Sequence, residues 1–428
     1  MKKVSFLILG CGSRGDTYSK YALAEPDKME IVGIAEPAKA RRNAFKERFN
    51  LPEENVVNDW KELLDRPKMA DAVMITTQDR MHFEPAMMAI EKGYHLLLEK
   101  PMAVTPEECM KIAEAAEKKG VYVIIGHVLR YAPFFSALKK LIDEGKIGDV
   151  TNINHTEGVG NVHQSHSYVR GNWHVEGDSA PMLLAKSCHD LDILQWLTHK
   201  DFKRIQSFGS LSHFRKENKP EGAPKRCIDG CPHGETCPYN AVKLYYDDKK
   251  NAWFRTAATL APTFLNATDE EVEKALRETP YGYCVYDSDN DVVDHQTVNM
   301  EFEDGVIATF TMSAFNKGGR RIHIMGTKGE MSGVASTGEI EVYTFEDKKT
   351  EVLKSSEVMQ DESILGGHGG GDSRLIKALC ELISEGSTTT SYCTARVSAK
   401  NHVAVFAAEE SRKRGVVIDI AEYEKTIL

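Results

Sequence analysis

The chain has 428 residues, enough for two or three domains, and its 41% hydrophobic and 28% charged residues are typical of a globular protein with a large core. Its formal net charge of −10, from 54 basic and 64 acidic residues, argues against a nucleic-acid partner or an anionic membrane, since both favour basic surfaces. No apolar run reaches the roughly 18 residues that a membrane-spanning helix needs.

The first 125 residues alternate short apolar runs with polar, helix-prone stretches. Each apolar run has the length and composition of a strand buried on both faces, and these runs occupy residues 4–9, 31–35, 72–76, 95–98 and 121–125. Helices are expected between them, at residues 14–25, 38–49, 83–92 and 106–119. This alternation predicts an α/β domain with a doubly wound parallel sheet, the Rossmann fold, which we place at residues 1–127.

After residue 130 the pattern changes, and residues 128–428 are expected to form a second, α+β domain. Helices are predicted at 133–144, 181–198, 372–386 and 394–413, and alternating strands at 204–214, 292–302, 306–315, 320–326 and 339–345. Asp304-Gly305 lies between two of these strands and predicts a tight hairpin, so the second sheet should be open and largely antiparallel. Residues from about 215 to 283 carry prolines and cysteines but few strand signals, and we interpret them as an insertion.

A glycine pattern follows the first predicted strand and opens a helix, in the run Gly10-Cys11-Gly12-Ser13-Arg14-Gly15. In this context the glycines let the backbone approach a pyrophosphate and aim a helix N-terminus at it. Glu36, at the end of the second strand, would accept hydrogen bonds from ribose hydroxyls and repel a 2′-phosphate, so NAD is favoured over NADP. NADP stays open because an arginine could bind that phosphate, the candidates being Arg14, Arg41 and Arg42.

Lys100 follows the predicted strand at 95–98, at the edge where open α/β sheets bind ligands. A lysine there can hydrogen-bond a substrate hydroxyl, and desolvation can lower its pKa into a range that suits proton transfer. A solvated lysine after a strand is the alternative, and composition alone favours it.

The glycine turn, the tripeptide Glu99-Lys100-Pro101 and a later helix bearing His189 together resemble the Gfo/Idh/MocA oxidoreductase family, over nearly the whole chain outside the insertion. The family includes glucose-fructose oxidoreductase and inositol dehydrogenase, so the resemblance implies hydride transfer between a ring carbon of a sugar or cyclitol and NAD. It also implies that Lys100 and His189 are catalytic and that Tyr131 lies beside the substrate. The further cofactor contacts implied by the resemblance are Thr76, Gln78, His82, Glu99 and Arg130.

The helix at 181–198 departs from the family pattern at one position. The family has an aspartate one helical turn before the histidine, but this chain has Ala185 there. Lys186 would supply a second cation to the substrate instead, and Asp192 would orient His189. A histidine is a suitable general base because its unperturbed pKa lies near neutrality, and a core histidine in an apolar helix is the alternative.

The loop at residues 163–174 is dense in polar and aromatic side chains. Such a loop suits a sugar, since aromatic faces stack on the ring and polar groups bond its hydroxyls. The residues expected to contact substrate are His166, Tyr168, Arg170, Asn172 and Trp173. An ordinary surface loop is the alternative for any one of them.

Three functions are compatible with these residues. The first is a dehydrogenase that releases NADH. The second is an NAD-dependent glycosidase, in which transient oxidation of the ring permits elimination and addition of water. The third is a non-enzymatic sugar-sensing regulator, against which the presence of both Lys100 and His189 argues.

Three of the nine cysteines lie close together, at Cys227, Cys231 and Cys237, and Cys284 or His233 could add a fourth ligand. Four soft ligands suit a structural, tetrahedral zinc, with an iron–sulfur cluster or free thiols as alternatives. The odd number of cysteines and the lack of an export signal predict a cytoplasmic protein with reduced thiols. An exposed face on the antiparallel sheet would suit a homodimer or homotetramer.

Overall fold

The structure is a computed structural model, and it describes residues 2–250, 252–259, 267–359, 370–389 and 391–427. Its strands are β1 (Val4–Leu9), β2 (Met29–Ala35), β3 (Val56–Val57), β4 (Ala72–Ile75), β5 (His95–Leu98), β6 (Val123–Ile125), β7 (Val150–Gly158), β8 (Phe202–Ser210), β9 (His295–Phe302), β10 (Ile307–Ser313), β11 (Gly319–Gly326), β12 (Gly329–Val334), β13 (Glu339–Thr344), β14 (Lys349–Lys354) and β15 (Ile418–Asp419). Its α-helices are α1 (Ser13–Ala24), α2 (Lys39–Phe49), α3 (Trp60–Leu64), α4 (Phe83–Glu91), α5 (Pro106–Lys119), α6 (Pro133–Asp143), α7 (Asn161–His163), α8 (Met182–Thr198), α9 (Ala252–Thr259), α10 (Asp269–Glu278), α11 (Ser355–Met359), α12 (Gly371–Glu385), α13 (Ala395–Arg414) and α14 (Ile420–Ile427). Short helical turns used below are η3 (Val128–Tyr131) and η4 (Gln164–Arg170).

Six parallel strands form the N-terminal sheet, in the order β3-β2-β1-β4-β5-β6. The central strand β4 is buried along its whole length, because helices cover both faces of the sheet. Consecutive strands diverge on either side of β1, which makes the carboxyl ends of β1 and β4 a natural ligand site. The predicted doubly wound sheet is therefore confirmed, and the prediction missed the two-residue edge strand β3.

Nine strands form the second sheet, in the order β14-β13-β12-β11-β7-β10-β9-β8-β15. Every pair is antiparallel except β7 with β10, so the largely antiparallel prediction is confirmed. Asp304 and Gly305 have φ of 60° and 83° between β9 and β10, which is the backbone that an Asp-Gly hairpin adopts. The strands that the sequence did not predict are β7, β12, β14 and β15.

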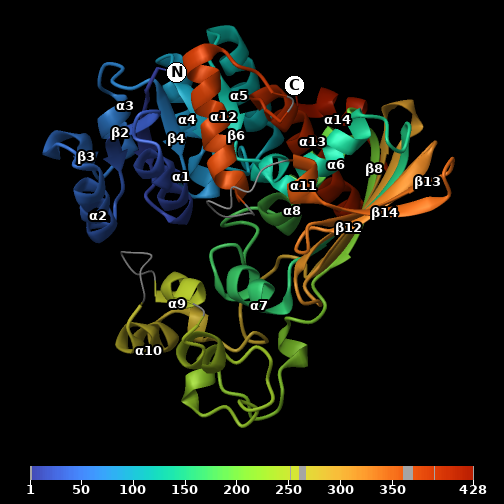
Figure 1. Cartoon of the computed structure of the whole chain (residues 1–428). Helices are drawn as coiled ribbons and strands as arrows, with labels where there is room; N and C mark the ends of the chain where they lie inside the picture. Colours follow the sequence, from blue (N-terminus) through green and yellow to red (C-terminus); the bar gives the residue numbers. More distant parts are fainter. Residues whose placement is uncertain (1, 251, 260–266, 360–369, 390, 428) are drawn as a thin grey trace.

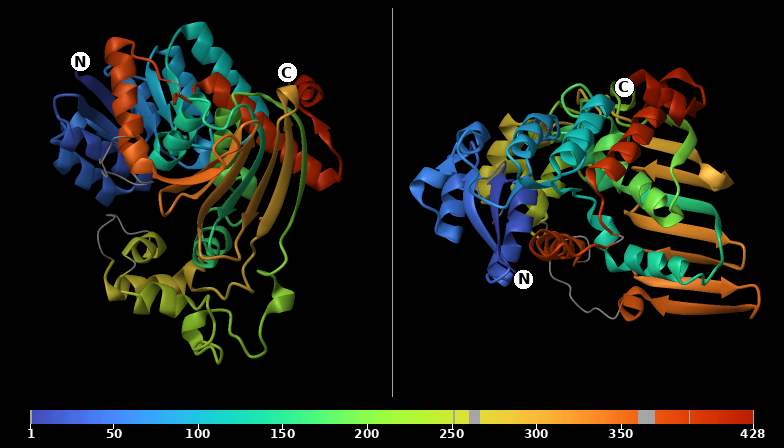
Figure 2. Two further views of the ribbon diagram at one scale, coloured as in Figure 1. Left: turned by 45° about the vertical axis from the view of Figure 1, so that its right-hand side comes forward. Right: turned by 90° about the horizontal axis from the view of Figure 1, so that it is seen from above.

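Helices α8 and α13 pack against one face of this sheet, between it and the N-terminal domain (Figure 2). Helix α12 instead returns to the N-terminal domain, where it lies against α1 and β1 (Figure 1). Its Leu375, Ile376 and Leu379 share one buried cluster with Phe6 and Ile8 of β1. A late segment of the chain thus completes the core of the first domain.

The segment between β8 and β9 forms a separate lobe below the N-terminal domain in Figure 1. It has a small core of its own, around Tyr245, Val272, Leu276 and Tyr281. The sequence predicted an insertion here but not its helices α9 and α10. Along the described ranges, no helix combines the length and the hydropathy that crossing a bilayer requires.

Candidate active site

A cleft of about 280 Å³ opens where the carboxyl ends of β1, β4 and β5 face the insertion and the loop after β7. Its N-terminal-domain side is lined by Gly12, Ser13, Arg14, Arg41, Thr76, Thr77, Gln78, Asp79, His82, Glu99 and Lys100. Its opposite side is lined by His166, Ser167, Asn172, Trp173, Ala185, Trp253, Ala257 and Tyr281. Two larger hollows of the surface, of about 450 and 570 Å³, lie away from the glycine turn.

The glycine turn has the shape that a pyrophosphate needs. A Cβ on Gly10 would lie 2.7 Å from the Thr76 carbonyl oxygen, and one on Gly15 would lie 2.3 Å from the Gly10 carbonyl oxygen, so side chains are excluded at both positions. A Cβ on Gly12, in contrast, would meet no atom within 4 Å. The backbone at Gly12 is therefore open to the cleft, directly before the N-terminus of α1, and this fits an anionic dinucleotide.

Glu36 is held at the end of β2 by two backbone amides. Its carboxylate accepts the N–H of Cys11 at 2.8 Å and the N–H of Ala38 at 2.9 Å. Arg42 donates to the carbonyl oxygen of Glu36 at 2.6 Å, whereas Arg41 lines the cleft. A fixed carboxylate at this point suits ribose hydroxyls, and Arg41 is the arginine placed to meet a phosphate there.

Arg14 and Glu99 fix the backbone on which Lys100 stands. The Glu99 carboxylate accepts Arg14 Nε at 2.7 Å, the Tyr18 hydroxyl at 2.5 Å and the Lys100 N–H at 2.9 Å. Burial alone would raise the pKa of Glu99, but Arg14 and the Tyr18 hydrogen bond lower it, so the group stays a carboxylate. Arg14 also donates to Asp372 at 2.6 Å, which joins the glycine turn to the first turn of α12.

Lys100 reaches across the cleft to helix α8, where its Nζ donates to the carbonyl oxygen of Ala185 at 2.7 Å. The amine therefore lies beside the position at which the family carries an aspartate. His189 is one turn further along α8, only 7% exposed, and its ring packs edge-on against His127 with centroids 5.4 Å apart. The catalytic roles of Lys100 and His189 stay predictions, and of the two only Lys100 lines the cleft.

Lys186 belongs to a buried network of charges beneath α8. Its Nζ lies 3.1 Å from Glu157 Oε1, and Arg320 Nε lies 2.9 Å from Glu157 Oε2 and 2.7 Å from Asp190 Oδ1. Burial lowers the pKa of Lys186, although Glu157 opposes this shift. The sequence predicted a second cation but missed its carboxylate partner, because Glu157 lies on a strand that the prediction did not contain.

The insertion supplies an aromatic wall to the cleft. The His166 ring stacks on Tyr281 with centroids 5.1 Å apart and lies 5.3 Å from the Trp253 ring. Burial lowers the pKa of His166 to about 3 and that of His163 to about 2, so both rings are neutral and can accept hydrogen bonds. The prediction treated the insertion as structural and missed this wall, although Trp253-Phe254 in a polar segment was a visible signal.

Trp173 and His82 hold the cleft edges together. Trp173 Nε1 donates to Asp79 at 2.9 Å, which connects the loop after β7 to the loop after β4. The two ring nitrogens of His82 lie 2.7 Å from the Pro101 carbonyl oxygen and 3.2 Å from the Thr77 carbonyl oxygen. The His82 ring is therefore held by two backbone carbonyl oxygens, and it also lines the cleft.

Arg130 and Asp192 pair with each other and are not among the residues that line the cleft. Arg130 donates twice to the Asp192 carboxylate, at 2.7 Å from both Nε and Nη2, and both side chains are buried. Opposite charges in an interior pair with each other. The cofactor contact of Arg130 and the role of Asp192 in orienting His189 stay predictions.

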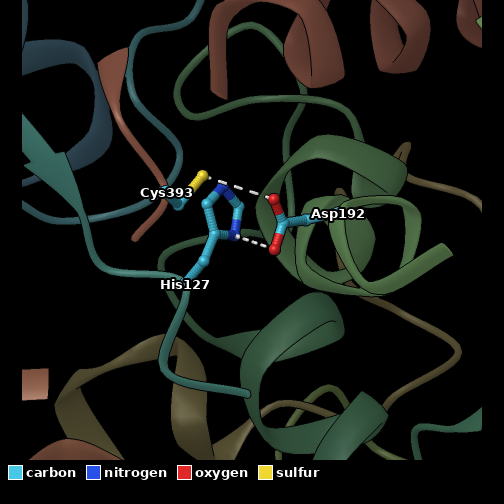
Figure 3. A group of neighbouring side chains, drawn as sticks. All are labelled: His127, Asp192 and Cys393. Carbon is cyan, nitrogen blue, oxygen red and sulfur yellow. Dashed lines mark hydrogen bonds and ion pairs between the residues drawn. The ribbon is translucent and has the colours of Figure 1, made fainter. Parts of the chain in front are cut away.

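Figure 3 shows what else surrounds Asp192. The Cys393 thiol donates to it at 3.3 Å, and His127 Nδ1 lies 3.9 Å away. In the part of the chain that the structure describes, these three are the one set of potential metal ligands within 4.8 Å of one another. Because Arg130 already compensates the carboxylate and burial lowers the pKa of His127 to about 4, we assign this cluster to packing.

Three further residues expected at the substrate are buried and do not line the cleft, so their substrate contacts stay predictions. Arg170 is buried, and it donates to the carbonyl oxygens of Tyr239 at 2.7 Å and Tyr283 at 2.8 Å, on the side of the insertion. Tyr131 and Tyr168 are buried and are not among the residues that line the cleft. Cys227, Cys231, Cys237 and Cys284 are free thiols that line a separate, small cavity.

Comparison with known proteins agrees with this geometry. Residues 4–127 match an oxidoreductase family with an NAD-binding Rossmann fold, and residues 139–420 match the C-terminal alpha/beta domain of the same family. An oxidoreductase of Bacillus subtilis (strain 168), YteT, is 24% identical over 389 residues, which cover 87% of this chain and 88% of that protein.

Two further proteins carry more specific names. Inositol 2-dehydrogenase of Salmonella typhimurium (strain LT2) is 25% identical over 202 residues, covering 47% of this chain and 56% of that enzyme, so this chain spans about half of its length. A levoglucosan dehydrogenase solved in complex with NADH and L-sorbose superposes with a TM-score of 0.71 at 19% identity, covering 98% of this chain and 99% of that one. The last likeness shows a shared fold.

Proposed function

The chain belongs to the Gfo/Idh/MocA oxidoreductase family, and from this premise we propose that it oxidises a ring carbinol of a sugar, glycoside or cyclitol with NAD. The observation that carries the proposal is Lys100, whose amine lies in the cleft between the open glycine turn and the aromatic wall. Relatives named for inositol and levoglucosan support a polyhydroxylated ring as substrate.

The residues of the cleft have separate tasks in this proposal. Lys100 donates a hydrogen bond to the reacting hydroxyl and positions it. The hydroxyl proton goes to Lys100 or to His189, which lies behind the cleft lining on α8. Neutral His166 accepts hydrogen bonds from other hydroxyls, while Trp253 packs against the apolar face of the ring. NAD, when bound, supplies the hydride acceptor.

The test is a panel of free sugars, cyclitols and aryl glycosides with excess NAD, in which NADH formation is followed. We expect one substrate class to give NADH in proportion to the substrate consumed. Failure of the whole panel, together with failure of NAD to bind in a calorimetric titration, would overturn the proposal.

A redox-neutral glycosidase is a second candidate, favoured by Ala185 at the family's acid position and by the lowered pKa of Lys186. A base of lowered pKa suits removal of the proton next to a transiently oxidised carbon, after which the glycosidic group leaves. Water then adds in its place, the proton is replaced, and the hydride returns to the oxidised carbon from the reduced cofactor. An aryl glycoside in D₂O distinguishes the two. The glycosidase releases phenol and a sugar that carries deuterium at the carbon next to the transiently oxidised one, with no net NADH, whereas the dehydrogenase accumulates NADH.

We also propose a homo-oligomer in the cytoplasm. Phe208, Ile307 and Val352 are exposed on the strands of the nine-stranded sheet, and such apolar side chains suit pairing with a second copy. The odd number of cysteines favours a reducing compartment. Light scattering tests the first point: a dimer or tetramer is expected, and Phe208→Lys should weaken it.

A further inference from the structure

The cysteine cluster, Cys227, Cys231, Cys237 and Cys284, surrounds one small cavity. All four line a space of about 20 Å³, which is room for a single water-sized body or ion. Four sulfur ligands around one ion are the composition of a structural zinc site. Among the described residues no three of these ligand atoms lie within 4.8 Å of one another, so the ion would have to draw the sulfurs closer together.

The backbone brings these four residues together from distant parts of the chain. The Cys284 N–H donates to the Lys225 carbonyl oxygen at 2.8 Å, and Arg226 pairs with Tyr283 as an isolated β-bridge, so Cys284 lies beside Cys227. Two tight turns follow, in which Gly234 N–H donates to Cys231 and Cys237 N–H donates to His233. The chain therefore folds back on itself at the cavity.

His233 also lines the cavity, but it is the weaker candidate for the fourth ligand. Its Nε2 lies 2.8 Å from the carbonyl oxygen of Glu221, which occupies one ring nitrogen. Cys284 is buried, and among the described residues no carbonyl oxygen is hydrogen-bonded to its thiol. The geometry therefore favours four sulfurs over three sulfurs and an imidazole.

Arg170 gives an independent reason for negative charge at the cluster. Its guanidinium is buried, and its Nη2 lies 3.9 Å from Cys227 Sγ as well as 2.7 Å from the Tyr239 carbonyl oxygen. Its Nη1 has no hydrogen-bond partner, and within the described ranges no carboxylate forms an ion pair with it. A buried cation without an anion is costly, and a zinc bound by four thiolates carries two negative charges that would compensate it.

We propose that this cluster binds one zinc ion and that Arg170 stabilises it from outside the ligand shell. The ion also has a structural role toward the cleft. Arg170 ends η4, and His166, one turn earlier on the same element, belongs to the aromatic wall. The metal therefore holds the insertion and the substrate side of the cleft in one arrangement.

Metal analysis of the purified full-length protein tests the site without any assay of activity, so its outcome is separate from that of the proposed function. Wild-type protein and Cys380→Ala, a control cysteine in α12, should contain one zinc per chain, whereas Cys231→Ala and Cys237→Ala should lose it. Iron with sulfide instead of zinc, or zinc retained in both cluster variants, would overturn the proposal.

If a cysteine variant fails to fold, a second measurement on the wild-type protein still tests the site. Reduced, metal-stripped protein titrated with Co²⁺ should develop the absorption of tetrahedral cobalt thiolate, and Zn²⁺ should displace it. Absence of these bands after addition of Co²⁺ to folded protein would contradict a four-thiolate site.

Arg170→Gln tests the outer partner. Loss of such a partner typically lowers metal affinity by about 10- to 100-fold, so a chelator should remove zinc more readily, and KM should rise more than kcat falls. Arg215→Gln, at an exposed arginine of the same insertion, is the matched control. Equal zinc retention in the two folded variants would remove Arg170 from the proposal.

Discussion

At the scale of single residues, Lys100 is the cleft residue that is held at both its backbone and its side-chain amine. Its backbone is fixed by Glu99 and its amine by the Ala185 carbonyl, so the side chain spans from the nucleotide side of the cleft to helix α8. This fixed amine is pre-organised to orient a hydroxyl, which is where we expect its contribution to catalysis.

Lys100→Met should lower kcat/KM by about 10²- to 10⁴-fold, because it removes the hydrogen bond and proton acceptor at the reacting hydroxyl. NAD affinity should change little. Steady-state NADH formation and a calorimetric NAD titration measure the two quantities. Lys111→Met, at an exposed lysine of α5, is the control, and equal kcat/KM in both variants would exclude Lys100 from the reaction.

Glu36→Ala should shift the cofactor preference toward NADP. A hydrogen bond to a charged group contributes about 1.5–3 kcal/mol, so kcat/KM with NAD should fall roughly 10- to 150-fold. Arg41 would then meet the 2′-phosphate without the repulsion of Glu36. Adding Arg41→Ala should abolish the gain with NADP, and a variant that gains no use of NADP would contradict this arrangement.

The sequence predicts residues whose role depends on neighbours close in the chain, such as the glycine turn and the lysine after β5. It does not predict Arg130 with Asp192, because these residues are far apart in sequence and pair only when η3 meets α8. Arg170 illustrates the same point, since its guanidinium donates to carbonyl oxygens of the insertion. A loop pattern shows that its side chains are polar, but not which of them face the cleft.

At the scale of elements, periodicity predicts that a segment is a helix with one buried face but not what covers that face. Residues 372–386 were predicted as a helix of the second domain, and α12 instead packs on β1 and α1. Likewise β7 was missed, although it pairs with both β10 and β11, since its run of polar residues suppresses the strand signal. Long-range packing decides both cases.

The aromatic wall gives a prediction at this scale. Trp253→Ala should raise KM about 2- to 12-fold with little change in kcat, since aromatic contacts of this kind contribute roughly 0.5–1.5 kcal/mol. Phe345→Ala is the matched control, because Phe345 is a similarly exposed aromatic residue outside the cleft. A fall in kcat with unchanged KM would instead place Trp253 close to the reacting atoms.

At the scale of the whole molecule, buried histidines predict a loss of stability in mild acid. Burial lowers the pKa of His127 to about 4 and those of His166 and His402 to about 3, against about 6.5 in an unfolded chain. Between these values the unfolded state binds more protons, so this stability is present above about pH 6.5 and is lost as the pH falls.

Each such histidine contributes a slope of up to about 1.4 kcal/mol per pH unit to the free energy of unfolding. Urea unfolding between about pH 7 and pH 5 measures the sum. In His402→Gln the slope of the free energy of unfolding against pH should fall by the contribution of one proton, up to about 1.4 kcal/mol per pH unit. A free energy of unfolding that does not change over this range would show that the histidines titrate equally in both states.

The return of α12 to the first domain has a consequence for how such genes can be cut and rejoined. Leu375, Ile376 and Leu379 cover β1. A protein truncated after residue 127 would therefore expose the apolar surface of the first domain that α12 covers, and it should aggregate. A chimera that takes only the first third of the gene from a relative would combine the first domain of one protein with the α12 of another, and their apolar side chains would not fit. A chimera that folds should take residues 371–385 from the same parent as the first domain, although the two segments are far apart in the gene.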